Sequence, residues 1–443
     1  MKHILVNLAL AYLRIAARIQ LTKVKPKIIG IAGSSGKSSL VNLIYEMLSE
    51  KFTVKQSSGK NSETGLPLDI LDIHMKGFGA LDWLVAFLMV PICLLINWKK
   101  YDYYIAEMGI DGPNEPKNMS YLLSFLDPYI GIVTNVSLEH AIYFEPYVEE
   151  VDPLIKLKKI LELTSQQETM LLLSLPKDGS AVVNIDDTHI ADVQKEIESR
   201  KITISLEKEA DLRGQDIVVS LTRFSMIVSY AGKNYSLVIS QPLPRHFAYE
   251  FLFALGVGLS VGLSIDECIT LIQKHFSLPS GRLSFFKGIK NTTIIDSTYN
   301  NATLPPILDI LDFVASISGN RRKIAIIGDM RELGQASENA HMTLAKKILQ
   351  TADYAVLIGQ LSEEYIVPIL REAQFSFDDF PDVSSSKEAI MQLIKEGDII
   401  LVKGSQNTLF LERIVEMLLA DKKDTEKLTR RGEFWDKKRL ESL

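Results

Sequence analysis

Residues 28–39 read IIGIAGSSGKSS, an apolar run followed by a glycine-rich turn and then by a helical pattern from Leu40 to Leu48. Glycines let the backbone of such a turn aim successive N–H groups at phosphate oxygens, and the N-terminus of the helix adds a partial positive charge. The stretch therefore predicts a nucleotide-phosphate loop, in which Lys37 reaches the β- and γ-phosphates of ATP and Ser38 completes a Mg²⁺ shell.

The predicted phosphate contacts are Gly33, Ser34, Ser35, Gly36, Lys37, Ser38 and Ser39. Ile31 stands where the longer phosphate-loop pattern has a further glycine. The alternative interpretation is a small-residue turn that only caps a helix. The order of strand, loop and helix favours nucleotide binding.

Short apolar runs alternate with helical patterns along most of the chain, and several of these runs are rich in β-branched residues. Such runs are typical of strands buried on both faces of a parallel sheet. The predicted strands are 27–32, 103–108, 130–134, 181–185, 293–296, 324–328, 355–359 and 399–402. The predicted fold class is α/β, with a central phosphate-loop ATPase domain on a mostly parallel sheet and a C-terminal Rossmann-like domain.

A length of 443 residues predicts two or three domains. The expected division is an amphipathic N-terminal helix at 1–26, a central ATP-binding domain at 27–279, a C-terminal domain at 280–420 and a charged tail at 421–443. Residues 206–238 alternate in polarity and predict an antiparallel excursion. The tail is expected to be a solvated helix or partly disordered.

Composition and charge limit the partners. A net charge of −6 gives no general attraction to nucleic acid, and two cysteines indicate a reducing cytoplasm. For the N-terminal helix, packing on its own protein and resting on a membrane surface are both open. A second apolar stretch at 77–98 favours an interfacial insertion over a membrane crossing. We expect a monomeric cytoplasmic protein with peripheral contact to the inner face of the membrane through 1–22 and 77–98.

Two strand-end segments carry candidate metal ligands. Ala106-Glu107-Met108-Gly109 follows one predicted strand, and Thr134-Asn135-Val136-Ser137-Leu138-Glu139-His140 follows the next. Ligands of open parallel sheets bind at the carboxyl ends of the strands, so Glu107 and His140 are expected near the phosphate loop.

The compact loop, these two segments and Asn61-Ser62-Glu63-Thr64-Gly65-Leu66-Pro67 together resemble the Mur ligase family. The resemblance covers about residues 27–420. It implies ATP and Mg²⁺, with Ser38, Glu107 and His140 at the metal. It also implies a carbamylated lysine that bridges metal ions, for which Lys158 is the choice and Lys156 stays open. Asn61 and Glu63 are implied substrate contacts.

Four C-terminal segments extend the resemblance. They imply Arg282 near the γ-phosphate, Asp296 at the ribose, and Tyr299, Asn300, Asp329 and Lys403 near the substrate. Gly328-Asp329-Met330-Arg331-Glu332-Leu333-Gly334 and Val402-Lys403-Gly404-Ser405 resemble the family members that add D-Ala-D-Ala. The segment of the diamino-acid-adding type is not found.

The chain departs from the family pattern at three places. Only 26 residues precede the first predicted strand, so the family's UDP-holding domain is expected to be missing or reduced. Glu250 stands where the family has an asparagine that contacts adenine, and Asn184 is a candidate to take over part of that contact. The apolar stretch 77–98 is extra.

The resemblance implies an ATP-dependent amide ligase acting through an acyl phosphate, with a small peptide or nucleotide-sugar substrate. Lys37, Glu107, His140, Lys158 and Arg282 are the implied catalytic residues, and domain closure on ATP is expected. Two alternatives remain open. One is a ligase of the same fold acting on a non-murein or lipid-linked substrate, and the other is an inactive nucleotide-binding scaffold at the membrane.

Overall fold

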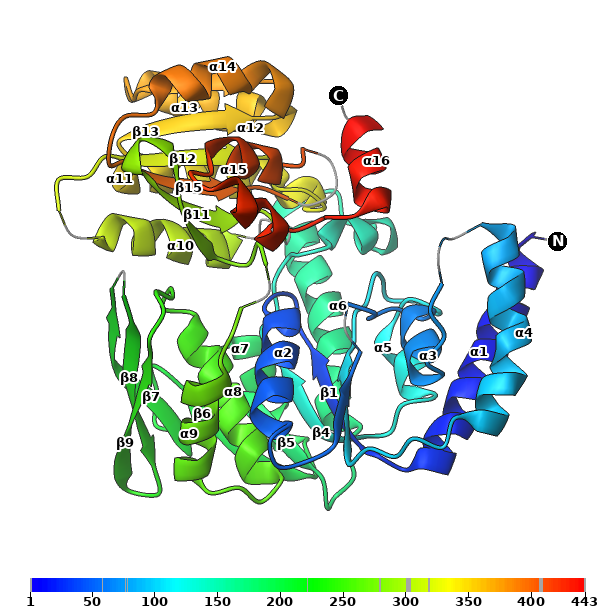
Figure 1. Cartoon of the computed structure of the whole chain (residues 1–443). Helices are drawn as coiled ribbons and strands as arrows, with labels where there is room; N and C mark the ends of the chain where they lie inside the picture. Colours follow the sequence, from blue (N-terminus) through cyan, green and yellow to red (C-terminus); the bar gives the residue numbers. More distant parts are fainter. Residues whose placement is uncertain are drawn as a thin grey trace. The chain divides into compact units, whose positions relative to one another are not determined.

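A computed structural model describes residues 2–57, 59–75, 77, 79–220, 222–278, 280–299, 304–317, 319–405 and 409–441 (Figure 1). The chain divides into two compact units. The first comprises Met1–Asp216, Met226–Leu237 and Ala248–Ser277, and the second comprises Ile217–Ser225, Val238–Phe247 and Leu278–Leu443. The last change of unit lies two residues from the boundary predicted at 279/280.

The first sheet has nine strands in the order β2-β3-β1-β4-β5-β6-β7-β8-β9. The pairings from β2 through β7 are all parallel. The strands are β1 (Lys27–Ala32), β2 (Val54–Gln56), β3 (Tyr103–Glu107), β4 (Pro128–Val133), β5 (Ser180–Asn184), β6 (Arg200–Ser205), β7 (Leu212–Val219), β8 (Phe224–Tyr230) and β9 (Lys233–Ile239). Short turns join β7, β8 and β9, which requires antiparallel neighbours and agrees with the predicted excursion.

Helices cover this sheet and are capped by local side chains. Asp152 accepts hydrogen bonds from the first N–H groups of α6, and Ser264 and Glu267 form a capping box on α9. The helices are α1 (Lys2–Val24), α2 (Lys37–Leu48), α3 (Gly65–Ile70), α4 (Ala80–Ile96), α5 (Met119–Leu123), α6 (Pro153–Leu173), α7 (Thr188–Asp192), α8 (Phe247–Ser260) and α9 (Ile265–His275), with short turns η1 (Ala141–Tyr143), η2 (Glu145–Tyr147) and η3 (Val193–Lys195).

The second sheet has six strands in the order β10-β11-β15-β12-β13-β14, of which only the β10–β11 pair is antiparallel. The strands are β10 (Ser284–Lys287), β11 (Thr293–Ser297), β12 (Lys323–Gly328), β13 (Tyr354–Ile358), β14 (Phe377–Phe380) and β15 (Ile399–Lys403). The helices are α10 (Leu304–Ser316), α11 (Ser337–Thr351), α12 (Gln360–Tyr365), α13 (Val367–Glu372), α14 (Val383–Leu393), α15 (Glu412–Leu418) and α16 (Glu433–Glu441), with η4 (Ile289–Asn291), η5 (Gly334–Ala336) and η6 (Lys422–Lys427). The predicted α/β class and all eight predicted strands are confirmed.

The two apolar stretches of the sequence form neighbouring helices, α1 and α4 (Figure 1). Leu13 and Ala16 of α1 share a buried cluster with Ala86 and Val90 of α4. Within the described ranges, no helix combines the length and the apolar character that a membrane crossing requires. The inner faces of this pair are therefore protein core, and the outer faces are described below.

The charged tail contains the helix α16 and is mostly exposed or half-buried over its described residues, but residues 428–430 are buried, which the prediction of a solvated tail did not include. The Arg430 guanidinium is almost fully buried and pairs with Glu412 of α15 at 3.0 Å. It also donates to the backbone carbonyls of Thr298 and Tyr299, at 3.3 and 3.0 Å. A buried cation needs such a complete set of acceptors, and it fixes the chain around residue 430 against the end of β11.

We expect Arg430→Met to lower the free energy of unfolding of the second unit by about 3–5 kcal/mol, because it leaves the Glu412 carboxylate buried without its ion-pair partner. Urea unfolding followed by Trp435 fluorescence measures this change. The exposed Arg371→Met is the matched control and should change stability by less than about 0.5 kcal/mol. In the double variant Arg430→Met/Glu412→Leu much of the loss should be recovered, and a double variant as unstable as the single one would refute the pairing argument.

Candidate functional site

The glycine-rich loop lies at the carboxyl end of β1, between the ends of β3 and β4. Gly33 and Gly36 have left-handed backbone angles, with φ of 116° and 82°. A Cβ atom on Gly33 would stand 2.2 Å from the Thr134 hydroxyl oxygen, so no larger residue fits there. The loop leads directly into α2, whose first N–H groups are unsatisfied within the helix. This is the geometry of a phosphate cradle.

The segment that follows β4 holds this loop in place. The Asn135 side chain accepts from the Ser35 N–H at 3.2 Å and donates to the Ser35 hydroxyl at 2.9 Å. The Thr134 hydroxyl donates to the Ser35 carbonyl at 2.6 Å, and the Ser137 N–H donates to the Ser34 hydroxyl at 2.8 Å. Sequence reasoning quoted this segment only for His140. Its run of small polar residues directly after a buried strand is the signal that could have revealed the supporting role.

The side chains of Lys37 and Glu168 both bond to the backbone of the loop. The Lys37 ammonium donates to the backbone carbonyls of Gly33 and Ser34. The Glu168 carboxylate, buried in α6, accepts from the Gly33 N–H at 2.7 Å. Burial raises the pKa of Glu168 to about 7, although the nearby Lys37 charge and the Gly33 hydrogen bond act in the opposite direction. Sequence reasoning missed Glu168, which lies 135 residues from its partner.

Glu107 occupies the position predicted for it, at the last residue of β3. Its side chain is buried, and its carboxylate accepts from the Asn61 amide at 3.1 Å. Asn61 is thereby brought to the predicted metal ligand, while Glu63 lies half-buried in the turn before α3.

His140 lies beyond β4, in a left-handed conformation at the start of η1, and its ring stacks on Tyr143. Its Nε2 is 4.0 Å from a carboxylate oxygen of Glu139. From the sequence, Glu107 and His140 were expected at the ends of neighbouring strands. The sheet order is instead β3-β1-β4, so the two residues lie on opposite sides of the loop strand β1.

The donor set of this edge suits a nucleotide with Mg²⁺. No described side chain caps the N-terminus of α2, so its first N–H groups can meet a phosphate. The buried Glu107 carboxylate supplies a hard oxygen ligand of the kind Mg²⁺ prefers. Among the described residues, no three His, Cys, Asp or Glu side chains converge as a ready metal cluster. The Ser38 hydroxyl, Glu107 and His140 are the groups that would hold the ion.

The structure does not bring Lys158 to this site. Its side chain is 78% exposed and lies 4.0 Å from Glu162 on the solvent face of α6. The buried stripe of α6 contains Ile160, Thr164 and Glu168, at the four-residue spacing of one helix face. Lys156, the alternative left open by the sequence, continues that stripe one turn earlier and is half-buried.

The other predicted nucleotide contacts of the first unit lie at the same edge. Asn184 ends β5 and is buried, and its side chain accepts from the Asp186 N–H at 3.1 Å. Glu250 is buried in the first turn of α8, and a Cβ atom on Gly36 would lie 3.6 Å from its carboxylate. Glu250 is thus next to the phosphate loop.

In the second unit, Arg282 and Asp296 lie around the end of β11. The Arg282 guanidinium is 5.0 Å from the centre of the Tyr299 ring. One oxygen of Asp296 accepts from the Thr298 N–H and hydroxyl, at 3.0 and 2.7 Å. The other oxygen is buried, and no donor among the described residues bonds to it; burial raises the pKa of Asp296 to about 6. That unused acceptor suits a hydroxyl donor, such as a ribose.

The remaining predicted substrate residues are divided. Asp329 accepts from the Ser362 N–H and hydroxyl, at 2.8 and 2.9 Å, and so holds the start of α12. Lys403 ends β15 and is buried. Asn300 lies outside the described residues.

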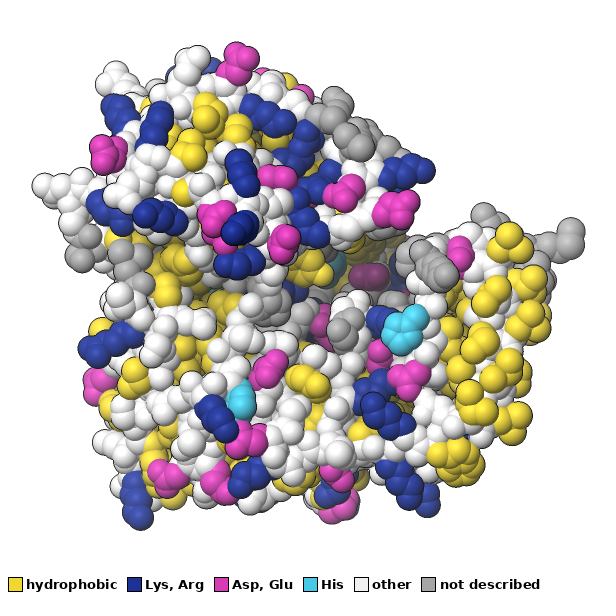
Figure 2. Space-filling view, viewed as in Figure 1, with side chains coloured by type: hydrophobic (Ala, Val, Ile, Leu, Met, Phe, Trp, Pro, Cys, Tyr) yellow, Lys and Arg dark blue, Asp and Glu magenta, His cyan; other side chains and the backbone are white. Residues whose placement is uncertain are grey.

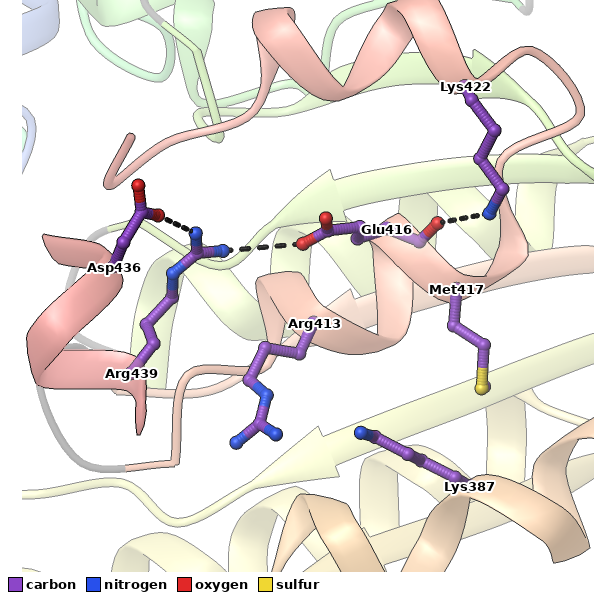
Figure 3. Close-up of a pocket in the computed structure, with 7 residues that line it drawn as sticks. All are labelled: Lys387, Arg413, Glu416, Met417, Lys422, Asp436 and Arg439. Atoms are coloured by element: carbon purple, nitrogen blue, oxygen red, sulfur yellow. Dashed lines mark hydrogen bonds and ion pairs between the residues drawn. The ribbon is translucent and has the colours of Figure 1, made fainter. Parts of the chain in front are cut away.

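A separate pocket of about 470 Å³ in the second unit contains none of these residues (Figure 3). Arg439 bridges Asp436 and Glu416, and the Lys422 ammonium donates to the Glu416 carbonyl at 3.1 Å. These contacts tie α16 to α15, which makes the pocket part of the anchoring of the tail.

Two family models match the chain. The model of the Mur ligase middle domain matches residues 31–258, and that of the Mur ligase, glutamate ligase domain, matches residues 281–406. Together with the phosphate loop and Glu107, these matches cover every predicted site residue.

Individual relatives carry one name. A UDP-N-acetylmuramoyl-tripeptide–D-alanyl-D-alanine ligase from Synechocystis is 25% identical over 402 residues, which cover 89% of this chain and 75% of that protein. The enzyme of that name from Escherichia coli is 23% identical, covering 92% and 80%.

Solved structures show the same fold. MurF from Acinetobacter baumannii has a TM-score of 0.74 at 17% identity, covering 92% of this chain and 79% of that one. MurF from Thermotoga maritima, in complex with ADP, has a TM-score of 0.71 at 19% identity, covering 94% and 84%.

The raised pKa of Glu168 predicts a pH-dependent stability. Because the folded pKa of about 7 lies above the ordinary glutamate value of 4.5, the wild type loses stability relative to Glu168→Gln as the pH rises from about 4.5 to about 7, and the difference is constant above that. The total change should be on the order of 3 kcal/mol.

Urea unfolding of both proteins between these pH values measures the difference. Glu162→Gln, on the solvent face of the same helix, is the control and should follow the wild type at every pH. A constant difference between wild type and Glu168→Gln across this range would contradict the prediction.

Proposed function

This chain belongs to the Mur ligase family of ATP-dependent ligases, and from that premise we propose that it joins D-alanyl-D-alanine to a UDP-N-acetylmuramoyl tripeptide in peptidoglycan synthesis. The observation that carries the proposal is the glycine-rich cradle at the end of β1, flanked by a buried carboxylate on one side and by His140 on the other. The names of the relatives support the choice of substrates, as do the Asp329 and Lys403 segments.

In the proposed reaction, a carboxylate oxygen of the tripeptide forms a bond to the γ-phosphorus of ATP and ADP leaves. The amine of D-alanyl-D-alanine then attacks the acyl carbon, loses a proton, and phosphate leaves. Two anions must meet in the first step, so neutralising charge is the main catalytic task. We propose that the first N–H groups of α2 and the Lys37 ammonium neutralise this charge, and that Arg282 is the cation of the second unit.

Mg²⁺, when bound, adds positive charge at the phosphates. Ser38, Glu107 and His140 are its proposed ligands, with Asn61 orienting the Glu107 carboxylate through their hydrogen bond. For the family's metal-bridging lysine we now propose Lys156, because it lies on the inward stripe of α6 and Lys158 does not. Asp296 is proposed to accept from the ribose of the nucleotide.

We propose that the protein works in the cytoplasm, in peripheral contact with the inner face of the membrane through residues 1–22 and 77–98. Small-molecule substrates are its proposed partners.

ADP release in the presence of ATP, Mg²⁺, the UDP-linked tripeptide and a panel of amines tests the proposal. D-alanyl-D-alanine should stimulate release more than L-alanine or a diamino acid. If ATP binds but no amine stimulates release with either the UDP-linked or a lipid-linked acceptor, catalysis by this chain is refuted. Stimulation with the lipid-linked acceptor alone would refute the substrate assignment.

We expect Lys37→Ala to lower amine-dependent ADP release by about 10²–10³-fold, because it removes a charge that faces the transferred phosphate. Circular dichroism should show an intact fold. Lys177→Ala, an exposed lysine paired only with Glu198, is the matched control and should retain the wild-type rate. Wild-type turnover in the Lys37 variant would rule out the assigned role.

The two lysines of α6 should separate in the same assay. Lys156→Ala should lower turnover by about 10²-fold, whereas Lys158→Ala should stay within a factor of about two, because its side chain faces solvent. Equal losses in both variants, or a loss confined to Lys158, would argue against the assignment to the inward stripe.

A further inference from the structure

The outer faces of α1 and α4, two neighbouring helices that run in the same direction, form one exposed apolar surface, which we call the helix-pair face. Fourteen of the 25 large apolar side chains exposed in the described residues lie on these helices or at Trp98 directly after α4. On α1 they are Val6, Leu8, Tyr12, Ile15 and Ile19, and on α4 they are Leu81, Leu84, Val85, Leu88, Met89, Ile92, Leu95 and Ile96. Figure 2 shows a broad apolar area over this part of the molecule, where α4 faces the viewer. Patches of this kind mark an interaction surface.

The spacing shows that each helix has two apolar faces with different roles. The outer residues of α4 recur every three to four positions, which places them on one side of the helix. The opposite side, with Ala86, Val90 and Cys93, packs against α1. The helix pair is held together by the edge-to-face contact of Tyr12 and Phe87 and by the Lys23 ammonium, which donates to the Leu94 carbonyl at 2.7 Å. The outer face is therefore available without unpacking the helices.

Basic residues lie at the end of this face where α1 and α4 both finish. Residues 1–27 contain six lysines and arginines and no acid, although the whole chain has a net charge of −6. Lys99 and Lys100 follow α4 and are exposed, as is Lys25 after α1. The one acid of α4, Asp82, accepts from the Gly79 N–H at 2.9 Å and caps the helix. An apolar centre with a basic margin is complementary to an anionic lipid surface.

Trp98 marks the edge of the apolar area. It is 63% exposed, its indole N–H donates to the Leu95 carbonyl at 2.9 Å, and the Lys23 ammonium lies 4.5 Å from the centre of its ring. Tryptophan beside lysine is typical of the headgroup level, where the ring meets the acyl chains and the ammonium meets phosphate. A second copy of this chain would instead bring an equally basic margin to the same contact, which like charges oppose.

The helix pair can lie on a bilayer but is too short to cross it. α4 has 17 residues, which span about 25 Å at ~1.5 Å per residue and fall short of a ~30 Å hydrocarbon core. The inner side of α1 is fixed to the first unit, where the Tyr121 hydroxyl donates to the Leu10 carbonyl and Arg14 lies over the Tyr121 ring. We propose that the helix-pair face docks on an anionic phospholipid bilayer, with both helices in the plane of the headgroups and Trp98, Lys25, Lys99 and Lys100 at the lipid phosphates.

This inference deepens the peripheral contact proposed above and does not depend on the ligase reaction. It also orients the site. α3 packs between the helix pair and the sheet, since Leu68 and Leu71 share the buried cluster of Leu13 and Ala16. The loop before α3 carries Asn61, which bonds to Glu107. Docking therefore fixes the carboxyl edge of the first sheet relative to the bilayer.

Flotation of the full chain with vesicles tests the proposal without nucleotide. Vesicles of phosphatidylcholine with phosphatidylglycerol should bind the protein, pure phosphatidylcholine should bind it less, and high salt should weaken binding. Leu88→Gln/Ile92→Gln should lower the bound fraction by about tenfold or more, because it removes two apolar side chains from the centre of the face. Met342→Gln/Met391→Gln, at exposed apolar positions in the second unit, is the matched control and should bind like the wild type.

Trp98 supplies an independent readout. Its emission should shift to shorter wavelength with anionic vesicles, and Trp98→Phe should lose that component. Absence of vesicle binding overturns the proposal, as does a stable dimer in light scattering that the Leu88/Ile92 variant dissolves. Amine-dependent ADP release by the same variant in solution separates the two proposals, since a failure of docking leaves that rate unchanged.

Discussion

The site depends on holding a glycine turn in a shape that leads directly into the N-terminus of α2. A left-handed turn such as Gly33–Gly36 is not the preferred conformation of a free chain, and its polar backbone groups need partners wherever they do not meet a ligand. Asn135, Thr134 and Ser137 satisfy the side of the turn that faces the protein. The N-terminus of α2, which no described side chain caps, is left to the phosphates. The order β3-β1-β4 is what brings that segment to the turn, so the parallel topology is a requirement of the site.

Glu168 introduces a negative charge into a site made for anions. Its carboxylate bonds to Gly33 and lies within electrostatic reach of Lys37 and His140. A buried carboxylate with a pKa of about 7 is close to half protonated near neutrality, so its charge responds easily to what binds nearby. An incoming triphosphate favours the neutral acid and Mg²⁺ favours the anion.

Much of the fold could be predicted from the sequence, because its dominant signals are local. Ile28, Ile29 and Ile31 mark a strand buried on both faces, and the glycines after it can form only a turn. Glu107 could be placed because it directly follows such a strand. Lys158 could not, since a shift of two positions on a helix turns a side chain by about 200° and moves it from the inward stripe to solvent. Glu168 and Arg430 were missed because their partners lie 135 and 18 residues away, and no local pattern marks a pair that only folding brings together.

The α1–α4 helix pair shows why an apolar stretch cannot be interpreted from its composition alone. Packing on the protein and contact with a membrane were opposed alternatives for the sequence, yet the two sides of the same helices serve both. Leu13 and Ala16 face the buried cluster, while Ile15 and Ile19 face outward from the same turns. A detachable anchor would need a linker between the helix pair and the domain. Here the inner sides belong to the core of the first unit, so the outer face cannot move without that core, and any surface it binds must be approached by the whole unit in one orientation.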